Sequence, residues 1–188
     1  MVNTLAKIKS LYQVSDASLA KLTALFYEKH FSSGEIILRE GKVEKSMFFI
    51  EKGLVRAYSD LPDRQITFWL GLEGDFIISM QSYINNKPGY ETVEVLEDSI
   101  LYEVDTEKLI ALFESDIELA NLSRKLAESE LVKLEEKFIY RQFKTATQVY
   151  AELLERIPSL PNRVQLKHIA SYLGISQVSL SRIRAKIK

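Results

Sequence analysis

The sequence predicts an α+β protein: an antiparallel β-roll or jelly roll, then one long helix, then a small helical domain. Three observations support this order. Short runs typical of β-strands, separated by glycine and proline turns, fill residues 31–104. Apolar residues at helical spacing follow, and two short amphipathic helices joined at Gly174 come last. The chain therefore divides into a β-roll with flanking helices, a long helix and a helical domain, at residues 1–115, 116–141 and 142–188.

Composition excludes several classes of protein. The 188 residues, 46% of them hydrophobic, suffice for a packed core. The absence of cysteine excludes disulfides, thiolate metal sites and cysteine-ligated iron–sulfur clusters. His30 and His168 lie far apart in sequence, so we expect structural roles for both and predict no metal or haem site. No apolar run approaches the roughly 18–20 residues of a membrane span, and the amino-terminal residues lack a signal-peptide pattern, so we expect a cytoplasmic protein that does not contact a membrane.

The predicted helices and strands fall into separate blocks along the chain, each with its own spacing of apolar residues. Two amphipathic helices are expected at 3–12 and 16–28. Six strands follow, with the sequences EIILR, SMFFIEK, LVRAYS, QITFWL, ETVEVL and SILYEV. A short helix over 106–113 and another over about 144–156 flank the long helix. Pro158 ends the second of these, because proline cannot continue a helix.

Residues 164–188 have the pattern of a helix-turn-helix motif, whose second helix enters the major groove of DNA. Gly174 stands where a residue that ends a helix commonly needs a positive φ, and Ser176 is a candidate N-cap. The second helix, 176–187, is expected to bury Leu180 and Ile183. The residues that we expect at the DNA are Lys167, Ser176, Gln177, Val178, Ser179, Ser181, Arg182 and Arg184.

Charge favours this motif over an ordinary helical bundle, where two amphipathic helices around a glycine turn also occur. From Ile157 onward there are six basic residues and no acidic one. Residues 141–188 carry nine basic and two acidic residues, a net charge of +7 within a chain of −1, so the remainder carries −8. A basic carboxyl end on an acidic body is typical of a nucleic-acid-binding module joined to another domain. We therefore expect double-stranded DNA as a partner.

The long helix has two interpretations. Its apolar residues recur every three to five positions, in a stripe that is long but is not a clean heptad. Either the helix packs only on its own β-roll, or it forms the seam of a homodimer. We favour the seam, because operators are usually read by two-fold dimers. The candidate dimerisation residues are Leu119, Leu122, Leu126, Leu134 and Phe138.

Two other classes of function compete with a DNA-binding regulator. An enzyme is not expected, because no carboxylate pair, nucleophile–base spacing or glycine-rich phosphate loop stands out. The glycines of 71–74 fit a turn between strands. The alternative is a β-roll sensor or scaffold dimer without sequence-specific DNA binding, and Arg182 and the acid-free tail argue against it.

The order of these blocks and two of their motifs resemble a known family. In SSGEIILREGKVEKSMFFIEKGLVRAY, turn glycines fall at positions 34, 41 and 53. In IASYLGISQVSLSRI, the matching residues are Ala170, Gly174, Ser176 and Arg182. Over nearly its whole length the chain resembles the cyclic-AMP receptor protein and fumarate–nitrate regulator (Crp/Fnr) superfamily of bacterial transcription factors. The resemblance implies a cyclic-nucleotide-binding-like domain, a homodimer, a small-molecule effector in each β-roll, and DNA and RNA polymerase as partners.

The effector site departs from the family pattern. Ile77 and Ile78 stand where the family has a glycine–glutamate pair for the ribose, and no arginine lies between Arg64 and Arg124 to neutralise a cyclic phosphate. A phosphate buried without a matched cation is strongly disfavoured, so we expect neither cyclic AMP nor cyclic GMP, and no other cofactor. The pocket is expected to be apolar and aromatic, and either takes a different small molecule or is filled by its own side chains. Its candidate residues are Phe76, Ile77, Ile78, Ser79, Tyr83 and Tyr90.

The DNA-reading face departs as well. Gln177 and Val178 replace the arginine and glutamate of the best-known members, whereas Arg182 is kept. Because arginine suits guanine and glutamine can pair with adenine, we predict that Arg182 reads a guanine and Gln177 an adenine or a phosphate. The serines are expected to position the helix on the DNA backbone, and further cations such as Lys188 to add salt-dependent attraction. The effector, the operator and the choice between activation and repression stay open.

Overall fold

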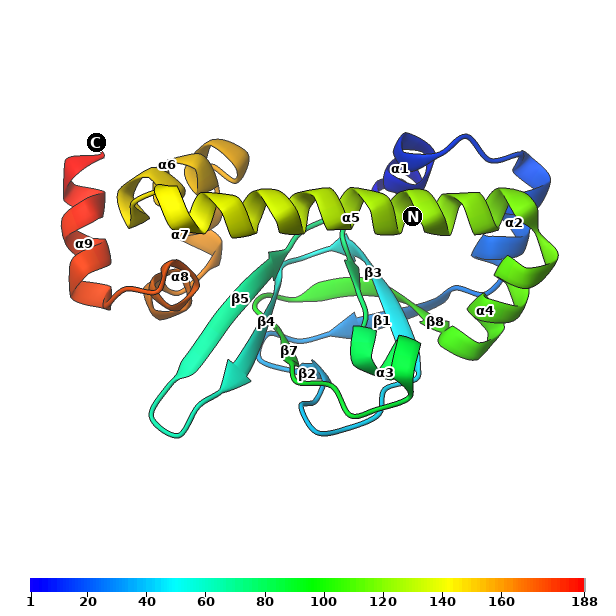
Figure 1. Ribbon diagram of the computed structural model, residues 1–188, viewed down its shortest axis with the longest axis horizontal. Coiled ribbons are helices and arrows are strands. Elements are labelled where there is room, and N and C mark those ends of the chain that lie inside the picture. The colour runs from blue at the N-terminus through cyan, green and yellow to red at the C-terminus, as the bar shows by residue number, and fades with distance from the viewer. Residues whose placement is uncertain (188) are drawn as a thin grey trace.

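The computed structural model describes residues 1–187, and one long helix organises it. Helix α5 (Ile117–Phe143) runs along most of the length of the molecule in Figure 1. Two β-sheets lie beneath its middle, helices α1, α2 and α4 gather at one end, and α6 to α9 gather at the other. Within the described residues, no helix is both long enough and apolar enough to cross a membrane.

The amino-terminal helices close one end of the sheets. Helix α1 (Val2–Leu11) is tied to the sheet by the Glu51 carboxylate, which accepts the backbone N–H of Val2 at 2.6 Å and of Thr4 at 3.1 Å. Helix α2 (Asp16–Thr23) begins at Ser15, whose side chain accepts the N–H of Ser18. Because α2 ends at Thr23, the predicted helix over 16–28 was too long.

The β-roll consists of two four-stranded antiparallel sheets. One has the order β1-β8-β3-β6 and the other β2-β7-β4-β5. The strands are β1 (Tyr27–Phe31), β2 (Ile36–Leu38), β3 (Ser46–Lys52), β4 (Val55–Asp60), β5 (Gln65–Gly71), β6 (Phe76–Ile77), β7 (Thr92–Val95) and β8 (Ser99–Asp105). A short helix, α3 (Met80–Asn85), interrupts the chain between β6 and β7. The six predicted strands correspond to β2, β3, β4, β5, β7 and β8.

The turn from β3 to β4 shows why one glycine is required. Gly53 has φ +115°, and a Cβ there would lie 1.9 Å from the Ser99 hydroxyl oxygen. This close approach joins the β3–β4 turn to the start of β8. The ends of several strands are thus held together at the edge of the roll that meets the carboxyl-terminal helices.

Side-chain caps set the boundaries of α4 and α5. Helix α4 (Thr106–Ser115) begins after Asp105, which accepts the N–H of Lys108. Asp116 caps α5 by accepting the N–H groups of Glu118 and Leu119. The same carboxylate bonds the Lys21 ammonium at 2.8 Å, and this hydrogen bond is the main reason why the pKa of Asp116 lies below its ordinary value. Helix α5 is thereby anchored at its first turn to α2.

The carboxyl-terminal segment folds into four helices: α6 (Ala146–Arg156), α7 (Leu160–Arg163), α8 (Leu166–Leu173) and α9 (Gln177–Lys186). Thr145 and Gln148 form a capping box at the start of α6. Helix α7 lies in a segment that the sequence did not predict to be helical, and Pro161 occupies its first turn, where the missing N–H costs no hydrogen bond.

One hydrophobic cluster spans the β-roll and the carboxyl-terminal helices. Leu54 and Leu70 of the roll belong to the same buried cluster as Tyr150, Leu160 and Leu180. Removing a large apolar side chain from water is worth about 1 kcal/mol or more, so the shared cluster links the two parts strongly. The two parts are therefore packed together as one body.

Candidate nucleic-acid interface

A glycine with positive φ and a serine N-cap determine the turn between α8 and α9. Gly174 ends α8 with φ +70°, a conformation that side chains other than glycine rarely adopt. The hydroxyl of Ser176 then accepts the N–H of Ser179 at 3.1 Å and caps α9. Leu180 is fully buried beneath the helix, and Ile183 is half-buried against the same cluster. These contacts fix which face of α9 points outward.

The outward face of α9 carries most of the predicted DNA-contacting residues. Helix α9 is the outermost element at its end of the molecule (Figure 1). Ser179 is the exception, since it is half-buried and bonded to the Ser176 hydroxyl. On α9 and its N-cap, the exposed members of the predicted set are Ser176, Gln177, Val178, Ser181, Arg182 and Arg184. The structure therefore brings these side chains together on one free surface.

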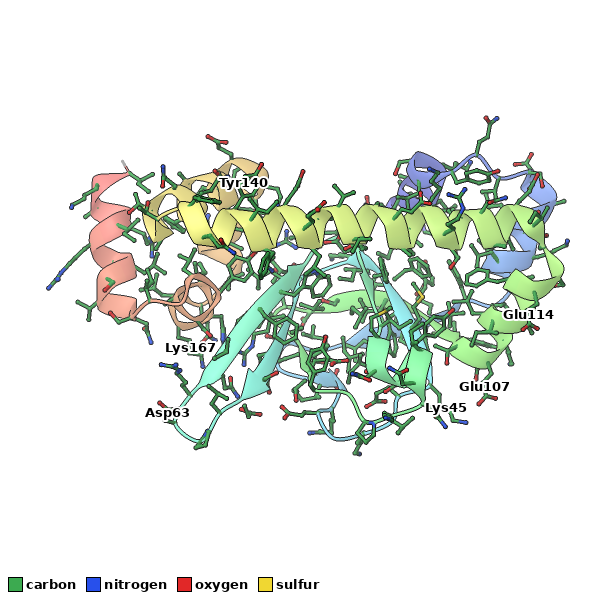
Figure 2. All side chains as sticks on the ribbon, viewed as in Figure 1. Lys45, Asp63, Glu107, Glu114, Tyr140 and Lys167 are labelled. Atoms are coloured by element: carbon green, nitrogen blue, oxygen red, sulfur yellow. The ribbon has the colours of Figure 1, made fainter. Side chains whose placement is uncertain are left out.

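The cations near this face do not all point toward it. Lys167 is exposed, but Figure 2 shows it beside the outer part of β5, on the side of α8 away from α9. Arg163 forms ion pairs with Glu73 and Glu97 of the β-roll. Lys188 lies outside the described residues. The free cations of α9 itself are Arg182, Arg184 and Lys186.

His168 lies on the inner side of α8, where it faces the β-roll. Its side chain is buried close to Arg56, whose guanidinium pairs with Glu94 at 2.6 Å. Burial first, and then the positive charges of Arg56 and Lys167, lower the pKa of His168 to about 4. The imidazole is therefore neutral at pH 7, in keeping with the structural role that the sequence predicted. In the described part of the chain, no group of three or more histidine, aspartate or glutamate residues could hold a metal.

The predicted effector pocket is not assembled as expected. Phe76 and Ile78 pack in the cluster beneath α1 and α5, and Ile77 is buried in the core between the sheets. Tyr90 is largely exposed, and Tyr83 is half-buried, which raises its pKa. The idea of one pocket lined by all these residues was wrong, because neighbouring residues of β6 point to opposite faces of its sheet.

A polar cluster that the sequence did not reveal lies behind α3. Ser79 and Ser82 are both buried, and their hydroxyl oxygens are 3.1 Å apart. Glu91 is only 6% exposed, and its Oε1 has no hydrogen-bond partner among the described residues. A Cβ at Gly89 would lie 2.5 Å from the Ser79 hydroxyl oxygen and 3.0 Å from Glu91 Oε1. The sequence did not predict that these residues meet, because their contact depends on how the loop after α3 packs against that helix.

The stripe of α5 divides into a buried part and an exposed part. Leu119 and Leu122 are buried in their own protomer, and Leu126 is half-buried against the same cluster. These three were predicted to form a dimer seam, which needs correction because the amino-terminal helices and the sheet already cover them. Leu134 and Phe138, also predicted, are 64% and 68% exposed.

The exposed side of α5 has a regular repeat. Its members follow one another at alternating spacings of three and four residues: Ile117, Ala120, Arg124, Ala127, Leu131, Leu134 and Phe138. This is the spacing of the inner positions of a two-stranded coiled coil. The repeat was not predicted, because in the sequence the buried leucines of the opposite side of the helix alternate with its members.

Comparison with known proteins places the chain among cyclic-nucleotide-binding folds. Residues 28–116 match the family model of the cyclic nucleotide-binding domain. No protein with a curated description matches the sequence significantly.

Several solved structures share the fold of nearly the whole chain. The catabolite activator protein of Thermus thermophilus is 17% identical, with a TM-score of 0.61 over 96% of this chain and 86% of its own. FixK2 of Bradyrhizobium japonicum is 21% identical, with a TM-score of 0.71 over 86% and 84%. The c-di-GMP-responsive global regulator CLP of Xanthomonas campestris is 17% identical, with a TM-score of 0.70 over 92% and 91%. These similarities confirm the fold that the predicted resemblance implied, over most of the chain.

Proposed function

We propose that this protein is a DNA-binding transcriptional regulator of the Crp/Fnr type, which binds a pseudo-palindromic operator as a homodimer. The observation that carries the proposal is the free outer face of α9, where Gln177 and Arg182 are exposed at the end of the molecule. With Ser176 as N-cap, α8, the turn and α9 form the helix-turn-helix motif, and residues 176–187 are its recognition helix. Side chains near the start of such a helix are the ones that reach base edges.

The outer stripe of α5 supports the dimer. Large apolar side chains at Leu131, Leu134 and Phe138 are more than half exposed. Small Ala120 and Ala127 occupy positions of the same repeat and let two helices approach closely. A parallel pair of α5 helices buries this stripe and places both α9 helices at the same end of the dimer, as a two-fold operator requires.

The charge of the reading face supports DNA as the partner. The described residues from Ile157 to 187 include no aspartate or glutamate, so no carboxylate of this segment opposes the cations of α9. Arg182 and Gln177 are suited to base edges, whereas Arg184 and Lys186 are suited to phosphates. RNA polymerase is a further partner only by family resemblance.

The β-roll supports an effector other than a cyclic nucleotide, or none. Behind α3, the buried ionisable side chain is the Glu91 carboxylate, and the nearby cation Lys87 is exposed. A carboxylate repels a cyclic phosphate rather than neutralising it. A regulator built in this way is expected to bind its operator equally well with and without cyclic AMP.

Selection of bound sequences from random duplexes tests the proposal. Purified full-length protein, at near-physiological salt and without added ligand, is expected to enrich a two-fold symmetric motif with half-sites about one helical turn, roughly 34 Å, apart. Weak, salt-sensitive binding without any motif contradicts a regulator that acts without effector. Repeating the selection with metabolite extract then separates an effector-dependent regulator, which recovers a motif, from the sensor or scaffold alternative, which does not.

A further inference from the structure

We infer that Arg163 is a positioning residue that clamps the carboxyl-terminal helices to the β-roll and thereby sets the half-site spacing that the dimer accepts. The inference rests on the proposed function, because spacing has a meaning only for a dimeric DNA reader. It assigns Arg163 a role that is distinct from DNA contact. In sequence, Arg163 is one more cation of a basic tail.

Arg163 is bound by two carboxylates at once. Its Nε lies 3.1 Å from Glu97 Oε2, and its Nη2 lies 2.5 Å from Glu97 Oε1 and 2.7 Å from Glu73 Oε1. The Arg163 side chain is only 21% exposed. A guanidinium held in two-point contact with one carboxylate and in contact with a second has a fixed orientation, which an ordinary surface ion pair lacks.

The two carboxylates come from the turns before β6 and after β7. Glu73 lies between β5 and β6, directly before the strand that leads into α3, and it also accepts the N–H of Gly53 at 3.2 Å. Glu97 lies between β7 and β8. Burial raises the pKa of Glu73, but the hydrogen bond from Arg163, the backbone hydrogen bonds and the charge of Arg163 together leave that pKa below its ordinary value. One guanidinium therefore joins three turns of the roll to α7.

The other described contacts at this boundary involve no ion pair. The Lys137 ammonium of α5 donates to the carbonyl oxygen of Phe68 and lies 4.9 Å from the centroid of the Tyr172 ring of α8. The Ser171 hydroxyl of α8 accepts the N–H of Thr67 and donates to the carbonyl of Gln65, both at 2.8 Å. The shared apolar cluster around Leu54 and Leu70 is strong but non-directional. In the described chain, the ion pairs that link residues 142–187 to the β-roll are those of Arg163.

The position of the Arg163 ion pairs explains why they affect the half-site spacing. The carboxyl-terminal helices connect covalently to the rest through Lys144, an extended residue that ends α5. A rotation of these helices about that residue displaces α9, which lies at the far end of the molecule (Figure 1). In a dimer both recognition helices move, so the distance between them depends on how firmly α7 is held. Without Arg163, Glu73 and Glu97 lose their cation, and no described ion pair holds α7 to the β-roll.

Duplexes with graded half-site spacing test the inference. Wild type is expected to show one optimal spacing in a series of inverted repeats that differ by single base pairs. Discrimination is the ratio of the affinity for the optimal spacing to the affinity for an altered one. We expect this ratio to fall at least about tenfold in Arg163→Gln and, separately, in the double variant Glu73→Gln with Glu97→Gln. Their affinity for a single half-site is expected to stay within about twofold of wild type. Arg156→Gln, which removes an exposed arginine of α6, is the matched control and is expected to keep the wild-type profile.

A distance measurement without DNA separates failure of the clamp from failure of the proposed function. The chain has no cysteine, so spin labels can be attached to cysteines introduced at Lys52 and Glu155 of the same protomer, with unlabelled protein in excess. The clamp variants are expected to broaden the distance distribution at unchanged circular dichroism. Distributions and spacing profiles that match wild type in both variants overturn the clamp. Absence of any symmetric motif for wild type overturns the proposed function, whatever the labels report.

Discussion

Arg182 and Lys186 lie on the same helix but are predicted to contact different parts of the DNA. Arg182→Ala is expected to cost about 1–3 kcal/mol at the selected site and to relax the preference at one base position, because a guanine loses its two-point partner. Lys186→Ala is expected to weaken binding to all sequences alike and to lower the salt slope by about 1. Titration of each variant against the selected site and a scrambled site distinguishes the two. Equal losses on both duplexes for Arg182→Ala would contradict base reading.

His168 gives the protein a predicted pH dependence of stability. Its pKa of about 4 in the folded protein lies below the ordinary value of 6.5, so between those values the unfolded chain binds a proton that the folded protein excludes. The free energy of unfolding is therefore expected to fall as pH falls from 6.5 to 4, by at most about 1.4 kcal/mol per pH unit from this group. Urea unfolding of wild type and His168→Gln at pH 7 and pH 5 checks this. Identical pH dependence in both proteins would remove His168 as the cause.

Single residues were predictable where local backbone chemistry decides. The positive φ of Gly174 and the Ser176 cap follow from rules that involve a few neighbouring residues, and both predictions are confirmed. Glu91 and Arg163 were not singled out, because their partners lie in other elements. The roles of Gln177 and Arg182 at DNA stay predictions.

Helix α5 carries the element-scale prediction, which concerns its two apolar faces. Leu134→Glu is expected to dissociate the dimer, because it places a charge inside the repeat that we propose as the seam. Val132→Glu is the matched control: Val132 is also more than half exposed, but it lies outside the repeat. Sedimentation equilibrium gives the mass of each variant. A dimeric Leu134→Glu protein, or equal dissociation of both variants, would contradict the seam.

Helices and strands were predictable where one face is buried, because their apolar residues then recur at a clear spacing. The six predicted strands formed, whereas β1 and β6 were missed. Strand β1 lies at a sheet edge and is almost entirely exposed, so it lacks the alternating apolar pattern of a half-buried strand. The overlong helix prediction at 16–28 has the same origin, since the chain from Tyr27 pairs with β8 instead of continuing a helix.

The whole molecule is predicted to unfold as one unit, because a single apolar cluster spans the β-roll and the carboxyl-terminal helices. Leu54→Ala, at a fully buried position of the roll, is expected to cost about 2–5 kcal/mol and to leave one transition. Calorimetry measures the number of transitions, and the circular dichroism signal of the helices should change together with tyrosine fluorescence. Two separate transitions in wild type would show that the two parts fold independently.

The order of the blocks was predictable from the sequence, but their docking was not. A β-type block, a long helix and a terminal helix pair each carry a local signal. The packing of α8 on β5 and the ion pairs of Arg163 join residues 66 to 106 positions apart, and no periodic pattern encodes such contacts. The contacts that bear on half-site spacing were therefore not predictable from the sequence.

The proposed function requires two chains to read one symmetric duplex through their α9 helices. Sedimentation velocity of the protein with a labelled duplex that carries the selected motif tests it most directly, because the mass of the complex counts the chains. We predict two chains on one duplex at saturation, and a larger fraction of free duplex for Arg182→Ala at a concentration that just saturates wild type. One chain per duplex, or a duplex that stays free at micromolar protein, would contradict the account.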